Sequence, residues 1–303
     1  MFGGSIQLVR LFGIRIGASP SWFVVLFLFI YLLSGYFERV VDAQGTAYVL
    51  AVVCALLFFA SLVLHELGHA LMARRLGIEI VGIDLWFFGG IAKMTQDTTS
   101  PGAEFKVAAA GPAVTLVIVA LCVGLSLSVA EVGDTLDVAT FAGDAQASPV
   151  LAVLAFLASI NAVLFVFNLI PAFPLDGGRL ARALVWRLTG DRGKATRIAG
   201  RLGQGFALLL IVYGAYRLVL TEDRLDGIYL GVLGWFLFQS ARSAVLSTAF
   251  AERLEGITVT DIMQDAAVVL RGGTPAVEAV EAPALRHDGW LPVVDDDRRL
   301  LGA

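Results

Sequence analysis

The chain has 303 residues, of which 58% are hydrophobic and only 16% are charged, and its mean hydropathy is +0.81. This composition is that of a polytopic membrane protein and excludes an ordinary soluble domain with a large core. The formal net charge is −4 and no basic run is present, which argues against nucleic acid as a partner.

Six apolar runs are long enough, or nearly long enough, to cross a bilayer as helices. In chain order they lie near Trp22–Phe37, Ala47–Ala73, Val107–Ala130, Val150–Ile170, Gly203–Leu220 and Gly227–Leu246. The first run is short for a straight crossing. No small-residue cleavage site follows it, so we predict a retained span and not a signal peptide.

The placement of lysine and arginine predicts the orientation of these spans. With the N-terminus in the cytoplasm, all of the 22 basic residues except Arg39, Arg217 and Arg224 fall on the cytoplasmic side. The loop 131–148 then lies outside, and it carries four acidic residues and no basic one. We therefore expect a multi-pass protein of the cell membrane with both termini in the cytoplasm.

The second run contains the motif HELGH at residues 65–69. On a helix, His65 and His69 are one turn apart, so their imidazoles project from one face and can share a zinc ion. Glu66 projects to the flank, where it can accept a proton as a general base. Apart from one tyrosine and one cysteine, the run 47–73 has no other ionisable side chain. Ionisable groups inside a membrane span are functional by default.

Two stretches on the cytoplasmic side are predicted to form short strands. Leu8–Ile16 and Ile78–Met94 alternate partly between apolar and polar residues, and Gly89-Gly90 is predicted to be the turn of a hairpin in the second stretch. An exposed strand edge beside the metal site can receive an extended peptide, which makes Gly89 and Gly90 candidate substrate-binding residues. A purely structural hairpin agrees equally well with these residues.

Catalytic zinc sites commonly use three protein ligands, so two histidines leave one position to fill. The remaining histidine, His287, lies in the predicted soluble tail and is a poor candidate. The segment 168–179 follows the fourth run on the side where the second run ends, and its two prolines break the helix. Within it, Asp176 offers an oxygen ligand. Taken alone, Asp176 is favoured as the N-cap of 178–188, but a nearby HExxH motif that lacks a ligand favours the metal role.

Taken together, these motifs resemble the site-2 protease family of intramembrane zinc metalloproteases. The resemblance covers about residues 5–250 and rests on HELGH at 65–69, the segment 168–179, AAAGP at 108–112 and FGG at 88–90. It implies one zinc ion per chain, with His65, His69 and Asp176 as ligands. It further implies Glu66 as the general base and Asn168 as a polar group in the substrate cleft.

The resemblance also implies the reaction, which is hydrolysis of a peptide bond within or near the transmembrane segment of a single-span membrane protein. This is regulated intramembrane proteolysis, and the lipid bilayer is its setting. The expected fold of residues 1–248 is a helical membrane domain with six transmembrane helices and short strands at the membrane surface. A homo-oligomer is compatible with the sequence.

After Ser247 the composition shifts, and residues 249–303 are predicted to be a partial α/β cytoplasmic domain. The segments 256–263 and 290–302 resemble the start and the first hairpin of a CBS domain, with the aspartates 295–297 in the hairpin turn. The resemblance implies an adenine nucleotide as ligand if the domain is completed, and we expect the sequence to stop inside it. An α/β appendage without a ligand is an equal alternative.

Two other functions use the same residues. A zinc-binding membrane transporter or metal sensor is the main alternative, but transport favours several sites along a path and needs no general base. The sequence offers one cluster, and that cluster contains Glu66. A catalytically inactive scaffold is expected to have lost a ligand or the base, and neither is lost.

Overall fold

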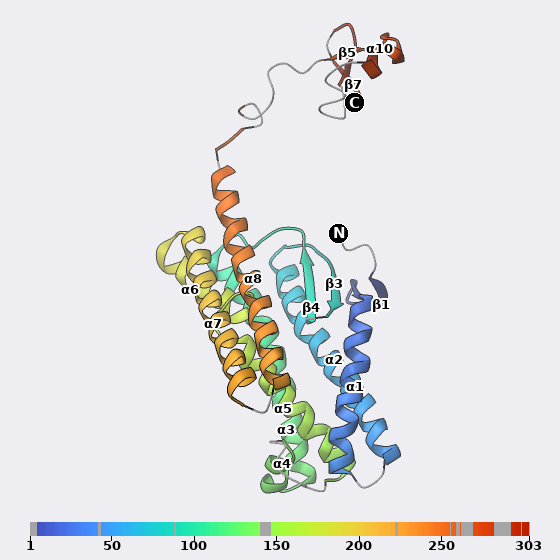
Figure 1. The fold of residues 1–303 in the computed structure, drawn as a ribbon, viewed down its shortest axis with the longest axis vertical. Helices are drawn as coiled ribbons and strands as arrows, with labels where there is room; N and C mark the ends of the chain where they lie inside the picture. The colour runs from blue at the N-terminus through green and yellow to red at the C-terminus, as the bar shows by residue number, and fades with distance from the viewer. Residues whose placement is uncertain are drawn as a thin grey trace. The chain divides into compact units, whose positions relative to one another are not determined.

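The computed structural model describes residues 5–41, 44–87, 89–139, 147–221, 224–254, 256–258, 261, 269–281, 292–297 and 299–302. The chain divides into two compact units, Met1–Ala249 and Phe250–Ala303 (Figure 1). The first unit is mainly helical. Its helices are α1 (Pro20–Val40), α2 (Gln44–Arg75), α3 (Pro101–Val129), α4 (Val132–Ala139), α5 (Pro149–Asn168), α6 (Asp176–Thr189), α7 (Arg192–Leu220) and most of α8 (Arg224–Leu254).

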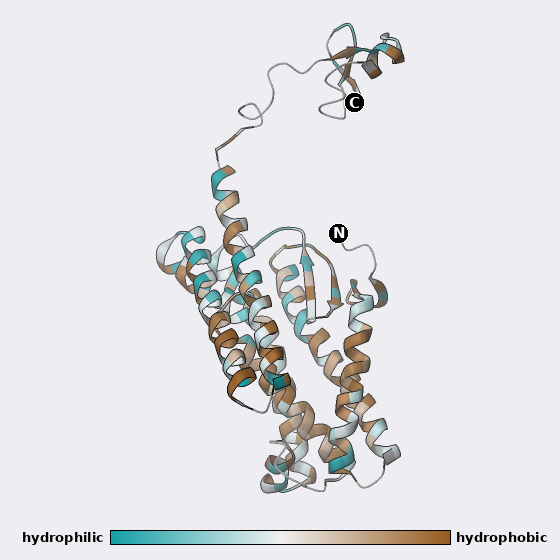
Figure 2. Ribbon diagram, in the orientation of Figure 1, coloured by the Kyte–Doolittle hydropathy of each residue, from teal (hydrophilic) through white to brown (hydrophobic). Residues whose placement is uncertain are grey.

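Five helices in the described part of the chain are long and apolar enough to cross a membrane, namely α1, α2, α3, α5 and α7. Hydrophobic residues cover most of α1 and α2, whereas hydrophilic residues gather at α6 and the neighbouring end of α7 (Figure 2). Helix α8 contains the sixth predicted run but is not one of these five. A sixth crossing therefore stays a prediction.

Local capping signals define where several of these helices begin and end. Ser100, Ser148 and Asp191 precede α3, α5 and α7, and each accepts a hydrogen bond from a backbone N–H in the first turn. Helix α6 ends at Gly190, whose φ of 71° is the left-handed conformation that glycine adopts without strain. Pro171 and Pro174 lie in the break between α5 and α6, where proline cannot continue a helix, and Asp176 is the first residue of α6.

A four-stranded sheet packs on α2. Its order is β1 (Ile6–Leu11), β2 (Ile14–Ala18), β3 (Ile80–Trp86) and β4 (Gly89–Met94). The outer pairs are antiparallel hairpins, and β2 and β3 run parallel. Ile14, Ile16 and Ile83 on the sheet are buried against Leu67 and Ala70 of α2. The sheet is therefore fixed directly to the helix that carries the HELGH motif.

A half-buried carboxylate ties three of these strands together. Asp84 on β3 accepts hydrogen bonds from Arg15 on β2, at 3.0 Å, and from Lys93 on β4. Burial raises the pKa of the Asp84 carboxyl, but the hydrogen bonds and positive charges of its partners outweigh this effect and hold the pKa below its usual value. The register of β4 against β3 is therefore secured by charge as well as by the backbone ladder.

The prediction that Gly89-Gly90 forms the hairpin turn was wrong. Both glycines lie in β4, where Gly89 pairs with Trp86 and Gly90 pairs with Leu85. A Cβ atom on Gly90 would lie 2.5 Å from Cγ of Glu66. Glycine is thus needed inside the strand, because it lets the β4 backbone pass closely over the metal-binding helix.

The described part of the second unit has β5 (Leu270–Arg271), α10 (Ala276–Glu281), β6 (Val293–Val294) and β7 (Leu300–Gly302). Strands β6 and β7 are antiparallel and flank the aspartate run, which confirms the predicted hairpin. Much of the predicted domain start at 256–263, together with His287, lies outside the described residues. The CBS assignment itself stays a prediction.

Candidate metal centre

Three ligand atoms from two distant parts of the chain meet at one point. The Nε2 atoms of His65 and His69 are 3.2 Å apart on one face of α2. Oδ2 of Asp176, at the start of α6, lies 3.1 Å from Nε2 of His65 and 3.2 Å from Nε2 of His69. Both histidines are buried. Among the residues that the structure describes, this is the cluster of side chains able to hold a metal ion.

The outer nitrogens of both imidazoles are fixed by hydrogen bonds. Nδ1 of His69 lies 2.7 Å from the carbonyl oxygen of Val107, which can only accept, so this nitrogen carries the proton. Nδ1 of His65 lies 2.8 Å from Oγ1 of Thr115, whose hydroxyl donates in turn to the carbonyl of Gly111. Both Nε2 atoms therefore present lone pairs toward the Asp176 carboxylate.

These atoms fit zinc. Three electron-pair donors lie within 3.2 Å of one another, and the two imidazoles carry their ring protons on the far side, so a cation placed between the three would satisfy all of them. Ligands at the vertices of a zinc tetrahedron with bonds of about 2.0–2.1 Å are separated by about 3.4 Å, close to the triangle seen here. One tetrahedral position is left for a reactant, as catalytic zinc sites require.

Glycine makes room for this cluster. A Cβ atom on Gly111 of α3 would lie 2.2 Å from Nε2 of His69 and 2.7 Å from Nε2 of His65. Gly68 likewise lets α2 approach α3, since its Cβ would lie 2.9 Å from the carbonyl oxygen of Ala110. The AAAGP motif at 108–112 is therefore a wall of the metal site.

Helix α6, which carries Asp176, is held against α3 by a buried ion pair network. Glu104 of α3 is fully buried and accepts from Nε of Arg179 at 3.0 Å and from Nη2 of Arg182 at 2.6 Å. The hydroxyl of Thr98 donates to its other oxygen. The position of Asp176 thus depends on the carboxylate of Glu104, which lies 72 residues earlier in the chain.

A cavity of about 590 Å³ opens at the ligand cluster, between α2, β4, the end of α5 and α8. It brings together all of the predicted site residues, which are His65, Glu66, His69, Gly89, Gly90, Asn168 and Asp176. Apolar side chains of α8, Leu233, Phe236 and Leu237, complete its lining together with Arg179. An apolar cavity with a few polar groups at a metal cluster suits a peptide ligand.

The sequence-based reasoning did not identify Thr115, Val107, Glu104 and Arg179 as parts of the site. The contacts of Thr115 and Val107 depend on how α3 packs on α2, which periodicity does not reveal. Glu104 did carry a signal: it is an acidic residue at the edge of an apolar run, and such groups usually pair inside the protein.

Comparison with known proteins agrees with a membrane metalloprotease, the class that this fold and site define. A model of Peptidase family M50 matches residues 53–130 and 117–212. "Putative zinc metalloprotease sll0528" of Synechocystis is 35% identical over 98% of this chain and 75% of its own length. "Putative zinc metalloprotease Rip3" of Mycobacterium tuberculosis is 32% identical over 98% of this chain and 73% of its own.

A solved structure agrees in fold. The site-2 protease from Methanocaldococcus jannaschii is 28% identical, with a TM-score of 0.51, and the match covers 80% of this chain and 95% of that one. The chain belongs to Peptidase family M50. It is a multi-pass membrane protein and a zinc metalloprotease of the site-2 type, with zinc as its cofactor.

Proposed function

We propose that this metalloprotease cleaves a peptide bond within or near the transmembrane segment of a single-span membrane protein. The observation that carries the proposal is the triangle of His65, His69 and Asp176 ligand atoms inside an apolar cavity that also contains Glu66. The ligand helix α2 is one of the candidate membrane spans, so the reaction would take place at membrane depth.

In this proposal His65, His69 and Asp176 hold the zinc ion, and Glu66 is the general base. When bound, zinc supplies a Lewis acid that acidifies water and polarises a carbonyl group. Glu66 accepts the proton of the attacking water and then gives it to the leaving amine. Its carboxylate lies on the same helix as both histidines and lines the same cavity, where both transfers are within reach.

We propose that the substrate binds as an extended strand along β4. In the described sheet β4 is an outer strand, and Gly89, Gly90 and Ile91 line the metal cavity. A peptide added there would form main-chain hydrogen bonds, with the half-buried Asn168 as a polar contact across the cavity. A substrate helix must unwind before this can happen, because helical carbonyls are hydrogen-bonded within the helix.

We further propose that α8 is a sixth crossing and that both termini lie in the cytoplasm. The excess of lysine and arginine on one side supports this orientation. For residues 249–303 we propose a CBS-like region with an adenine nucleotide as its ligand; the paired strands β6 and β7 support it.

The proposal is tested with purified full-length protein in liposomes that contain a single-span test substrate. We expect zinc-dependent cleavage, lost on chelation and restored by added zinc. Glu66→Gln should keep about one zinc per chain and lose cleavage by about 10²–10⁴-fold, because only the proton acceptor is removed. The double variant His65→Ala/His69→Ala should lose the metal as well.

The same measurements separate a protease from a zinc transporter or sensor. Asp97→Asn serves as the matched control, since Asp97 is an exposed acidic residue that does not line the metal cavity. A transporter would move zinc across the liposome membrane and leave the substrate intact. Turnover of Glu66→Gln within about tenfold of wild type would contradict the role of Glu66.

A further inference from the structure

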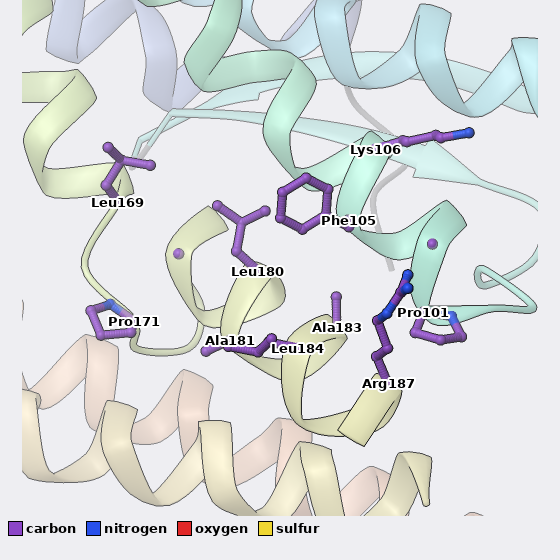
Figure 3. A pocket seen from close by; sticks show the side chains of 12 residues that line it. Pro101, Phe105, Lys106, Leu169, Pro171, Leu180, Ala181, Ala183, Leu184 and Arg187 are labelled. Atoms are coloured by element: carbon purple, nitrogen blue, oxygen red, sulfur yellow. The ribbon is translucent and has the colours of Figure 1, made fainter. Parts of the chain in front are cut away.

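A second cavity, of about 600 Å³, lies between the start of α3, helix α6 and the turn that follows α5 (Figure 3). It shares no lining residue with the metal cavity. Its wall includes Gly177, the residue after Asp176, so the two cavities lie on either side of the chain segment that supplies the third ligand. A ligand here would touch this segment without reaching the metal.

The wall of this second cavity is apolar. Phe105 of α3 and Leu180 of α6 point toward each other across it (Figure 3). On α6, Leu180, Leu184 and Leu188 follow one another at intervals of one turn, and the last two are 58% and 76% exposed. In a membrane protein, such an exposed apolar stripe on an amphipathic helix faces the acyl chains of lipids.

The rim of the cavity is positively charged. Lys106 of α3 and Arg187 of α6 line it, and both are exposed. Within the described residues neither makes an ion pair, whereas Arg179 and Arg182 of the same α6 helix both pair with Glu104. The side chain of Arg187 extends toward α3 beside Pro101 (Figure 3). There the N-terminus of α3 adds its own positive partial charge.

We propose that this cavity binds an anionic phospholipid. Its acyl chain would lie along the leucine stripe of α6 and against Phe105, and its phosphate would lie between Lys106 and Arg187. Charge and shape both select this occupant, because no acidic residue lines the cavity and its wall offers an acyl chain an apolar surface. The Lys106 side chain extends away from Arg187 in Figure 3, so its long, flexible stem would turn toward the headgroup when the lipid binds.

Neither a substrate peptide nor a free phosphate ion explains the cavity as well. A scissile peptide must reach the ligands His65, His69 and Asp176, none of which lines this cavity. A free phosphate ion would use the two cations but not the apolar wall. The phospholipid uses both, and it would contact Gly177, the residue that follows Asp176.

The test measures lipid binding to the full-length protein in detergent, by native mass spectrometry, as phosphatidylglycerol or phosphatidylcholine is titrated in. We expect one phosphatidylglycerol to bind in preference to phosphatidylcholine. Lys106→Gln/Arg187→Gln should weaken that binding about tenfold or more and leave phosphatidylcholine adducts unchanged. The matched control Arg75→Gln/Arg201→Gln removes two exposed basic residues of the same unit that do not line the cavity, and should bind as wild type does.

Two further arms keep the result interpretable. Ala181→Trp should fill the cavity and weaken phosphatidylglycerol binding without any change of charge. A photoreactive phosphatidylglycerol should cross-link to residues 180–187. Displacement of the lipid by millimolar inorganic phosphate, or equal binding by the wild type and the rim variant, would overturn the proposal. No arm depends on cleavage, so this inference and the proposed protease reaction fail separately.

Discussion

At the scale of single residues, the metal site depends on groups that never touch the metal. His65 and His69 can present Nε2 lone pairs only because Thr115 and the carbonyl of Val107 hold their Nδ1 atoms. Such outer hydrogen bonds fix the tautomer and the orientation of a ligating imidazole. The two outer partners come from α3, so the HELGH motif alone does not make the site.

Thr115→Val should therefore weaken zinc binding while leaving the fold intact. Valine keeps the shape of threonine but cannot accept the proton of His65 Nδ1, and loss of such a partner typically costs about 10–100-fold in metal affinity. Competition with a chromophoric chelator measures the affinity. Ser126→Ala is the control, because Ser126 is also buried on α3 and, among the residues described, bonds to the carbonyl of Cys122 on its own helix. Equal zinc affinity in both variants would refute the role of Thr115.

How far the sequence predicts this site differs from residue to residue. His65, Glu66 and His69 follow from helical spacing, because ligands within one turn of a helix need no tertiary information. Asp176 lies on another helix, and only the missing ligand and the family resemblance pointed to it. Thr115 could not be predicted from the sequence, since a threonine on an apolar helix does not indicate a hydrogen bond to a metal ligand until its neighbours in the fold are known.

At the scale of elements, the third ligand is positioned by how α6 docks on α3. The carboxylate of Glu104 is fully buried and is compensated by Arg179 and Arg182. Breaking a buried ion pair by removing one partner typically costs about 3–5 kcal/mol, because the other charge is left uncompensated. Glu104 is thus a positioning residue that acts on the metal site through α6.

Glu104→Gln should lower both the thermal stability and the zinc content, because the two arginines lose their counter-charge and α6 loosens. Glu104→Asp should restore part of the zinc content, which a general packing defect would not explain. The exposed pair of Asp97 and Arg192 provides the control: Asp97→Asn should cost no more than about 1 kcal/mol. Unchanged zinc content in purified Glu104→Gln would show that Asp176 is held by other means.

The strand β4 shows where element prediction failed. A glycine pair between two apolar stretches is typical of a hairpin turn, yet Gly90 is required inside the strand because Glu66 occupies the space of its side chain. That requirement comes from packing between β4 and α2, which local sequence patterns do not report.

Gly90→Ala should therefore displace the Glu66 side chain and lower cleavage, with zinc content near that of the wild type. The added Cβ would lie 2.5 Å from Cγ of Glu66, closer than carbon atoms tolerate. Gly124→Ala on α3 is the control, because its Cβ would meet nothing within 4 Å. Cleavage by Gly90→Ala at the wild-type rate would show that Glu66 can relocate without loss of function.

At the scale of the whole molecule, hydropathy predicted the helical membrane fold, and five of the six expected spans meet the criteria of length and composition. Hydropathy failed to reveal α4, an eight-residue helix in the predicted external loop. Short helices of this kind depend on contacts with neighbours, and Val138 of α4 is buried against Leu151 and Ala155 of α5.

The orientation of the molecule in the membrane is the remaining prediction, and it decides on which side the substrate is processed. Asp137 lies in α4 and Lys194 at the start of α7, and both side chains are exposed. Cysteines introduced one at a time at these positions should differ in reaction with a membrane-impermeant maleimide on intact cells. We expect Asp137→Cys to be labelled from outside and Lys194→Cys only after the cells are opened, because basic residues are retained on the cytoplasmic side.

The two native cysteines, Cys54 and Cys122, are buried and provide a low background. The reverse labelling pattern would invert the predicted topology.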